Sequence, residues 1–145
     1  MNLVESVSPP ALKSFVFPVR VYFEDTDAAG VAYYASYLRF IERARSEWLR
    51  ALGYPQGKLA NDTGTGFVVR SLSVEYRRPA RLDDALEVVS RLLELRRAQV
   101  MFDQRVERDG VLLVGATVRV ACVELGIMKP TPIPAEMYRR FQALL

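Results

Sequence analysis

Three carboxylates stand close together in the chain: Glu24, Asp25 and Asp27. They follow a stretch of alternating apolar residues and come shortly before a long amphipathic stretch, residues 36–52. The first backbone N–H groups of a helix lack partners and carry partial positive charge, so they can polarise a carbonyl group and stabilise an oxyanion. A carboxylate beside them can attack that carbonyl or activate a water molecule. The pattern therefore predicts acyl-transfer chemistry, and the alternative is a turn that uses Asp for local hydrogen bonds.

Histidine is absent from the chain, and Cys122 is its single cysteine. A His-based triad, a Cys-His pair and a His-ligated metal site are therefore excluded, and one thiol cannot build a metal cage. We expect no metal and no cofactor. A general base must then be a carboxylate, an amine or a phenol.

The composition indicates one globular domain, because a chain of 145 residues can bury a core without disulfides or metals. We expect residues 15–145 to form it, behind a loose leader at residues 1–14 that does not resemble a signal peptide. No apolar stretch approaches the roughly 18–20 residues that span a bilayer. We therefore predict a cytoplasmic protein with no stable membrane insertion. The net charge of +3 comes from dispersed arginines, which does not favour nucleic-acid binding.

Residues 36–52 have the apolar period of a helix. The residues that recur on one face are Tyr37, Ile41, Ala44, Trp48 and Leu52. Ser36 is the expected N-cap, and Gly53 is expected just beyond the C-terminal end. A polar, Gly-rich connection follows at residues 54–66, with room for a short helical turn.

Residues 16–24 alternate like a half-buried strand, with Val19, Val21 and Phe23 on the buried face. Four more strands are expected at 67–76, 85–95, 99–108 and 111–123, and a short helix at 135–145. Gly115, inside the last strand, suggests a bulge or a close backbone approach. Short turns join these strands, so neighbours are antiparallel and the fold class is α+β.

The expected architecture is a five-stranded antiparallel sheet wrapped around one long helix. Five strands at about 4.8 Å give a sheet about 24 Å wide, which matches the length of the helix. The sheet face away from the helix is expected to carry four apolar side chains among polar ones: Val89, Leu93, Val111 and Leu113. An uncovered, partly apolar face is a candidate subunit interface, so we expect a homo-oligomer.

Residues 22–40 read YFEDTDAAGVAYYASYLRF, and ERAR follows at 42–45. Shorter segments continue the pattern: FVVR at 67–70, VEY at 74–76, PARLDD at 79–84 and MKP at 128–130. Together these resemble the 4-hydroxybenzoyl-CoA thioesterase family, and within it the YbgC-type, Tol-Pal-associated acyl-CoA thioesterases, over residues 18–134. The resemblance implies the hotdog fold, in which an antiparallel sheet wraps a long helix and chains assemble as dimers and often homotetramers.

The resemblance also implies a set of site residues. It places the catalytic aspartate at Asp27 and the carbonyl-polarising backbone N–H at Tyr34. Many YbgC-type relatives carry histidine at that position, whereas the 4-hydroxybenzoyl type carries tyrosine. Gly30 and Val31 correspond to positions that contact the substrate.

Three more positions enter through the resemblance. Arg96 and Arg97 match a basic pair that contacts the CoA nucleotide, and the alternative for them is a solvated turn between two strands. Glu42 matches an acidic residue near the bound acyl group in some relatives, and the alternative is a surface ion pair with Arg45.

The resulting hypothesis is an enzyme of lipid metabolism that hydrolyses the thioester of an acyl-CoA, or of an acyl carrier protein, to a free acid and a thiol. Asp27 is its nucleophile or its general base, and the sequence leaves both roles open. The alternative function is a non-catalytic acyl-CoA-binding hotdog protein that uses the same groove.

Overall fold

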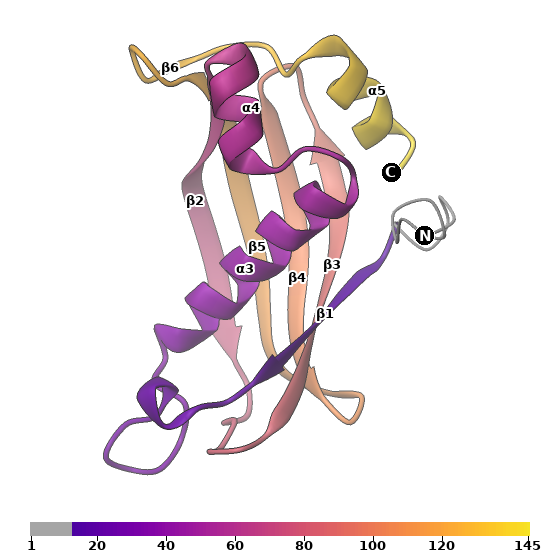
Figure 1. The fold of residues 1–145 in the computed structure, drawn as a ribbon. Helices are drawn as coiled ribbons and strands as arrows, with labels where there is room; N and C mark the ends of the chain where they lie inside the picture. The colour runs from indigo at the N-terminus through magenta and orange to yellow at the C-terminus, as the bar shows by residue number, and fades with distance from the viewer. Residues whose placement is uncertain (1–12) are drawn as a thin grey trace, which may run out of the picture.

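The computed structural model describes residues 13–145, so residues 1–12 of the predicted leader lie outside it. One long helix, α3 (Ser36–Ala51), crosses one face of an antiparallel sheet (Figure 1). The strands are β1 (Phe15–Arg20), β2 (Thr65–Tyr76), β3 (Ala85–Leu95), β4 (Gln99–Arg108) and β5 (Val111–Glu124). Their order in the sheet is β1-β3-β4-β5-β2, and a short β6 (Lys129–Pro130) pairs with β5.

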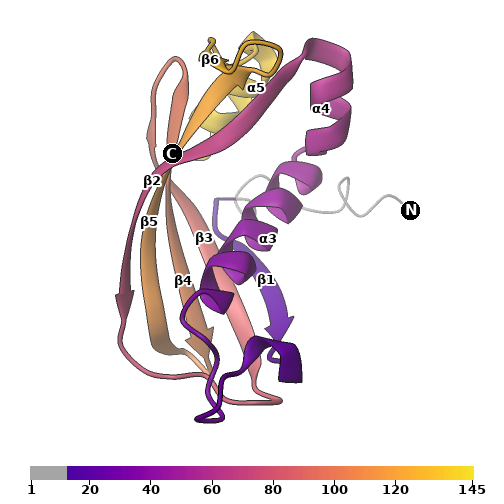
Figure 2. The same cartoon turned by 90° about the vertical axis from the view of Figure 1, so that its left-hand side faces the viewer.

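The sheet curves around α3, as the view turned by 90° shows (Figure 2). Two short helices lie at the end of the molecule opposite the start of α3: α4 (Gln56–Thr63), which packs against β2, and α5 (Ala135–Gln142), which packs against β3. The predicted α+β arrangement of one helix wrapped by a sheet is confirmed. Within residues 13–145, no helix is both long and apolar enough to cross a membrane.

The apolar stripe of α3 supplies the centre of the core. Phe40, Ala44 and Trp48 of this stripe are almost fully buried against the sheet. The ring of Trp48 stacks on Phe15 of β1 at 6.1 Å and meets Phe102 of β4 edge-on at 5.8 Å. Contacts to both strands fix the direction in which α3 crosses the sheet.

The first strand is shorter than its alternation predicts. Pairing with β3 ends at Arg20, which lies opposite Ala85, and the N–H of Val21 donates to the carbonyl of Asp84 just before β3 (2.9 Å). The chain then turns into the 3-10 helix η1 (Phe23–Asp25), because the Asp25 carboxylate accepts a hydrogen bond from the N–H of Tyr22 (2.8 Å). Phe23 is therefore 82% exposed, and the prediction that it faces the core is wrong.

The predicted cap of the long helix is also wrong. Ala35 occupies the N-cap position and has no side-chain cap, whereas Ser36 is the first residue inside α3. The hydroxyl of Ser36 is buried and donates backwards to the carbonyl of Asp25 (2.9 Å). At the other end Gly53 follows the helix with φ +98°, a left-handed conformation that suits glycine, as predicted.

The irregularity expected at Gly115 lies two residues earlier. Gly115 pairs regularly with Arg105 and Glu75, whereas Leu113 is an extra residue between the pairs Val106–Val114 and Glu107–Leu112. The bulge turns the Leu113 side chain into the core, where it is fully buried. The prediction that Leu113 lies on the outer face is therefore wrong. Val111 and Leu93 are exposed, and Val89 is partly exposed.

One polar side chain sits inside this core and ties α3 to the sheet. Gln104 of β4 is fully buried. Its Nε2 donates to the carbonyl of Ile41 (2.8 Å) and to the hydroxyl of Ser90 (2.9 Å). Its Oε1 accepts a hydrogen bond from Nη1 of Arg45 (2.9 Å). Every hydrogen-bonding atom of this amide group thus has a partner.

Replacing Gln104 by Leu is expected to lower the free energy of unfolding by about 3 kcal/mol, because the change leaves a buried guanidinium N–H and a buried carbonyl without partners. Urea denaturation measures this loss. Gln99→Leu is the matched control, since Gln99 begins the same strand and, in the part of the chain that the structure describes, its side chain has one hydrogen bond, from the partly exposed Arg119. Equal stabilities of the two variants would contradict this account of the core.

Candidate active site

The acidic turn forms a tight loop that presents Asp27. The N–H of Asp27 donates to the carbonyl of Val31 (2.9 Å), and the N–H of Gly30 donates to the carbonyl of Asp27 (3.0 Å). Gly30 has φ +79°, which a residue with a side chain rarely adopts. The Asp27 carboxylate accepts one local bond, from the N–H of Ala29 to Oδ1 (2.8 Å). Asp27 itself is exposed to solvent.

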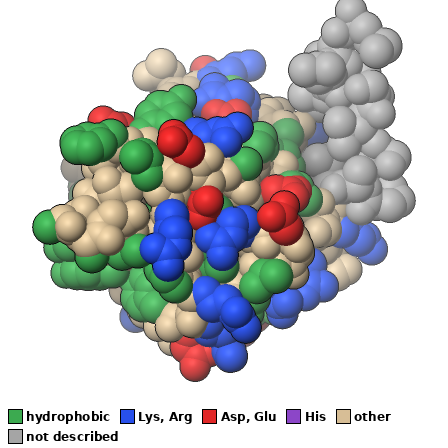
Figure 3. Space-filling model, turned by 90° about the horizontal axis from the view of Figure 1, so that it is seen from below, with side chains coloured by type: hydrophobic (Ala, Val, Ile, Leu, Met, Phe, Trp, Pro, Cys, Tyr) green, Lys and Arg blue, Asp and Glu red, His purple; other side chains and the backbone are tan. Residues whose placement is uncertain are grey.

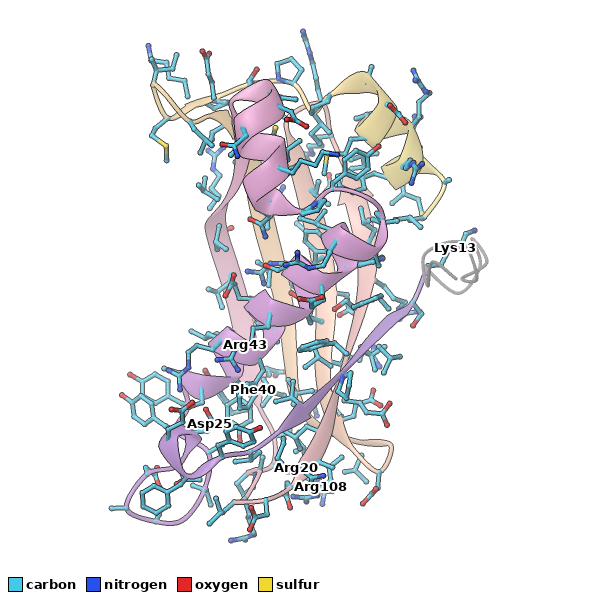
Figure 4. All side chains as sticks on the ribbon, viewed as in Figure 1. Lys13, Arg20, Asp25, Phe40, Arg43 and Arg108 are labelled. Atoms are coloured by element: carbon cyan, nitrogen blue, oxygen red, sulfur yellow. The ribbon has the colours of Figure 1, made fainter. Side chains whose placement is uncertain are left out.

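Asp25 joins the two ends of this loop. Its carboxylate is buried, with Oδ2 bound to the N–H of Tyr22 (2.8 Å) and Oδ1 lying 3.5 Å from Nη2 of Arg39 on α3. Its carbonyl accepts hydrogen bonds from the N–H of Tyr33 (2.8 Å) and from the hydroxyl of Ser36 (2.9 Å). Figure 4 shows Asp25 beside the first turn of the helix. This one residue therefore fixes where the strand ends and where the helix starts.

The start of α3 leaves two backbone donors free. The N–H groups of Ala32, Tyr33 and Ser36 all donate to carbonyls nearby. Within residues 13–145, those of Tyr34 and Ala35 donate to no acceptor. They stand at the positive end of the helix dipole, where an anionic oxygen is stabilised.

Tyr34 and Asp27 line one cleft, and Ala35 follows Tyr34 directly in the chain. The cleft measures about 730 Å³ when counted out to open solvent, and Asp27, Tyr34, Tyr37 and Tyr76 are among its lining residues. Seen from below, this end of the molecule shows hydrophobic side chains gathered on one side and Lys and Arg side chains across the middle (Figure 3). A carboxylate, unpartnered N–H groups and aromatic surface thus lie together.

Tyrosines form much of the wall of the cleft. The hydroxyl of Tyr76 donates to the carbonyl of Tyr34 (3.1 Å), and the Tyr37 hydroxyl accepts from the N–H of Ala80 (2.9 Å). Burial raises the pKa of Tyr37 and of Tyr76. A side-chain hydrogen bond with Tyr34 raises the pKa of Tyr33. These phenols stay protonated at neutral pH, so they can donate hydrogen bonds but do not serve as bases.

The cleft also contains residues that sequence reasoning missed. Arg77, Arg78 and Pro79 come from the segment after β2, and Tyr76 ends that strand. No spacing in the sequence connects them to the acidic turn more than forty residues earlier. The only signal was their place inside or beside the short segments VEY and PARLDD of the resemblance.

The structure brings together only some of the predicted site residues. Gly30 and Val31 lie in the same turn as Asp27, and the backbone of Val31 forms an isolated antiparallel β-bridge with that of Arg81. Glu42 lies further along α3 and makes no ion pair with Arg45 in the described part of the chain, so the predicted surface pair is wrong. Arg45 is instead buried and bonded to Gln104.

Arg96 and Arg97 lie at the far end of the sheet from Asp27. Strand β3 begins at Ala85, which pairs with Arg20 near the acidic turn, and it ends at Leu95, directly before the two arginines. The ten residue steps from Ala85 to Leu95, at about 3.3 Å each, place the two arginines roughly 33 Å from the end of β3 that lies near the acidic turn. Nε of Arg96 is also bound to Oε1 of Glu94 (2.6 Å).

Comparison with known proteins identifies the family. The profile of the Thioesterase-like superfamily matches residues 21–141. The chain belongs to this superfamily. The acyl-CoA thioesterase YbgC of Haemophilus influenzae is 48% identical over 130 residues, which cover 90% of this chain and 96% of that protein. The acyl-CoA thioester hydrolase YbgC of Escherichia coli is 46% identical over 129 residues, 88% of this chain and 96% of that protein.

Solved structures agree with this assignment. A probable thioesterase from Bartonella henselae matches with a TM-score of 0.80 at 36% identity, covering 83% of this chain and 99% of that one. The predicted family and hotdog fold are therefore confirmed, as is the prediction that the protein is a thioesterase.

Replacing Asp25 by Ala is expected to lower the free energy of unfolding by about 1–3 kcal/mol, because a partly buried N–H and the guanidinium of Arg39 lose their acceptor. Thermal or urea denaturation measures the change. Glu24→Ala is the control, since the neighbouring Glu24 is exposed. If both variants are as stable as the parent protein, Asp25 does not hold the loop.

Proposed function

We propose that the protein hydrolyses acyl-CoA thioesters in the cleft that holds Asp27 and Tyr34. One observation carries the proposal: the Asp27 carboxylate and Tyr34, whose N–H at a helix start has no partner in the described residues, line the same cleft. The printed names of the relatives from Haemophilus influenzae and Escherichia coli support acyl-CoA as the substrate class. Residues 15–145 act as one thioesterase domain, in the cytoplasm, and serve lipid metabolism.

The N–H of Tyr34 binds the oxygen of the thioester carbonyl, with the N–H of Ala35 beside it. As the carbonyl carbon becomes tetrahedral, negative charge grows on this oxygen, and the helix start stabilises it more strongly than it stabilises the neutral carbonyl. One such donor is worth about 10²–10³ in rate. Gly30 and Val31 keep the opposite side of the turn close to the substrate, and Glu42 lies further along the path of the acyl group.

Asp27 acts in one of two ways. As a general base it takes a proton from water, the hydroxide adds to the carbonyl carbon, and the collapsing intermediate expels the CoA thiolate. As a nucleophile its Oδ adds to the carbonyl carbon, the thiolate leaves this tetrahedral adduct so that a mixed anhydride forms, and water then adds to the Asp27 carbonyl of the anhydride and releases the free acid. A single turnover in ¹⁸O-water separates the routes, because only the second one leaves ¹⁸O in the Asp27 carboxylate.

The cleft offers no better base than Asp27. The pKa values of Tyr33, Tyr37 and Tyr76 are raised, so these three phenols hold their protons at neutral pH. The arginines of the cleft, Arg77 and Arg78, stay charged and attract the anionic substrate. Neither route requires histidine, in agreement with the composition of the chain.

Replacing Asp27 by Asn is expected to lower kcat by about 10²–10⁴, because the amide can neither attack nor accept the proton of water. Release of CoA thiol, followed with a thiol-reactive dye, measures the rate. Circular dichroism verifies that the variant remains folded.

Two control variants sharpen this test. Glu24→Gln removes an exposed carboxylate of the same turn and should keep the parental rate. Tyr34→Phe keeps the backbone N–H and should change kcat only a few-fold. Normal turnover by Asp27→Asn, or tight acyl-CoA binding by the parent protein without thiol release, would contradict the proposed function and favour a binding protein.

Arg96 and Arg97 bind the CoA nucleotide only from another subunit in this proposal, since they lie at the opposite end of their own chain from Asp27. Arginine suits this role because its guanidinium forms paired hydrogen bonds with phosphate oxygens. Within the described residues, Arg97 makes no ion pair and lines a shallow cleft with Arg139 of α5. The protein therefore works as a homo-oligomer, a dimer or a tetramer, with composite sites.

Arg97→Ala is expected to raise KM for acyl-CoA about tenfold, the loss of one charge-assisted phosphate contact. Mixed oligomers of Arg97→Ala and Asp27→Asn chains should recover turnover at nearly the parental KM, because one composite site then has both residues intact. Mixing after partial denaturation and refolding, with thiol release as the readout, tests this. Mixed oligomers that keep the high KM would place Arg97 outside the site.

A further inference from the structure

A second cleft lies beside the middle of α3, away from the acidic turn. Its floor is the sheet, with the apolar side chains of Phe67, Val69, Phe102 and Val120. Its cavity volume is about 90 Å³, below the roughly 300–1,000 Å³ of sites that enclose a whole small molecule, so it has room for one end of a chain. The floor suits the hydrocarbon part of a ligand.

The helix wall of this cleft carries a buried guanidinium with free donors. Arg45 is only 8% exposed. Of its five N–H donors, those on one nitrogen, Nη1, have a partner, the Oε1 of Gln104 at 2.9 Å. No carboxylate lies within 4.0 Å of Arg45 in the part of the chain that the structure describes, and its Nε and Nη2 bond to nothing there.

These donors open into the cleft. In residues 13–145, the single side-chain polar atom that is sealed from solvent without a partner is Nε1 of Trp48. Nε and Nη2 of Arg45 are therefore reachable, and Arg45 is a lining residue of the cleft. A charged group this deeply buried is ordinarily paired, so the cleft is set up for a guest that brings an oxygen acceptor.

Glu42 decides which acceptor fits. It lines the same wall, is exposed, and accepts a long hydrogen bond from the hydroxyl of Ser46 (3.4 Å). Burial lowers the pKa of Arg45, and the charge of Glu42 acts in the opposite direction. A guest carboxylate would bind Arg45 but would be repelled by the negative charge of Glu42. A methyl group would form no hydrogen bond with Arg45 or with Glu42. A hydroxyl group accepts from Arg45 and donates to Glu42.

We propose that this cleft binds the distal end of the acyl group and selects acyl chains that end in a hydroxyl group, held between Arg45 and Glu42. The proposal rests on the proposed thioesterase function and names its substrate class. Arg45 is nine residues beyond the first residue of α3, or about 14 Å along the helix. A saturated chain advances about 1.25 Å per carbon for C–C bonds of about 1.5 Å, so a chain that follows α3 spans this distance with about eleven carbons.

The test compares kcat/KM for ω-hydroxyacyl-CoA and plain acyl-CoA of equal length, in a series from four to sixteen carbons. The ratio should peak near eleven carbons at about tenfold to hundredfold, as expected for a hydrogen bond to a charged group. The ratio is internal to each preparation, so a loss of folded protein does not change it. The ω-carboxyl series should show a weaker preference than the ω-hydroxyl series.

Variants assign the preference to Arg45. Arg45→Met and Arg45→Lys should bring the ratio close to one, because Met has no donor and the single nitrogen of Lys cannot both reach Gln104 and stand where Nε and Nη2 of Arg45 meet the guest. Arg43→Met is the matched control, since Arg43 is an exposed arginine on the same helix (Figure 4) and should keep the parental ratio. If the Arg45 variants do not fold, the ratio measured with the parent protein still shows whether ω-hydroxyacyl-CoA is preferred.

Three outcomes overturn the proposal: a ratio near one at every length, a stronger preference for the ω-carboxyl series, or a parental ratio in folded Arg45 variants. None of these affects the proposed function, which requires only that acyl-CoA is hydrolysed through Asp27. Failure to hydrolyse any plain or ω-hydroxylated acyl-CoA would instead reject the proposed function itself.

Discussion

The candidate site depends on the hydrogen bonds of the buried Asp25, which connect the end of β1 to the start of α3. Its carboxylate stops β1 by binding the N–H of Tyr22, and its carbonyl receives Tyr33 and Ser36 at the entry to α3. The ten residues between these contacts have hydrogen bonds of their own, such as those of Asp27 with Val31 and Gly30, and the Asp25 contacts join the two ends of the loop. Asp27 and the N–H of Tyr34 lie on this loop, so their separation follows from the Asp25 contacts. Donors held in this way are already oriented when charge develops, and no free energy is spent on turning them.

The site also depends on how α3 packs against the sheet. Trp48 and Phe40 fix it by apolar contact, and Gln104 adds directional bonds to the Ile41 carbonyl and Arg45. Because the helix is rigid, this one placement decides where two different groups stand. Its first turn brings unpartnered N–H groups to the first cleft, and its middle brings a guanidinium to the second. A change in how the helix crosses the sheet would move both.

Much of the fold follows from patterns that are local in the sequence. The predicted bounds of β3 and β4 are those of the structure, since apolar alternation and the turn at Asp109 and Gly110 mark them directly. The errors at Phe23 and Ser36 come from hydrogen bonds to Asp25, and the error at Leu113 comes from a register shift against β4. Periodicity encodes neither kind of partner.

The candidate site likewise has one part that is local in the sequence and one part that is not. Asp27, Gly30, Val31 and Tyr34 lie within eight residues of one another, so one loop brings them together and the sequence predicts their proximity. Tyr76 and the residues after it enter the cleft only because β2 runs antiparallel to β5 and ends beside α3. Pairing across the sheet decides that contact.

Chemistry through backbone donors also explains how a chain without histidine can do acyl transfer. The side chain of Tyr34 is 60% exposed and is not needed to orient its own N–H, which the carbonyl contacts of Asp25 and the helix start position. Residue 34 can therefore differ between relatives while the donor stays in place. Asp27 has no such freedom in the proposed mechanism, because its proposed role requires the carboxylate itself. In the proposed mechanism a helix start and a carboxylate on one loop fill both roles, and the phenols around them supply shape and hydrogen bonds rather than a base.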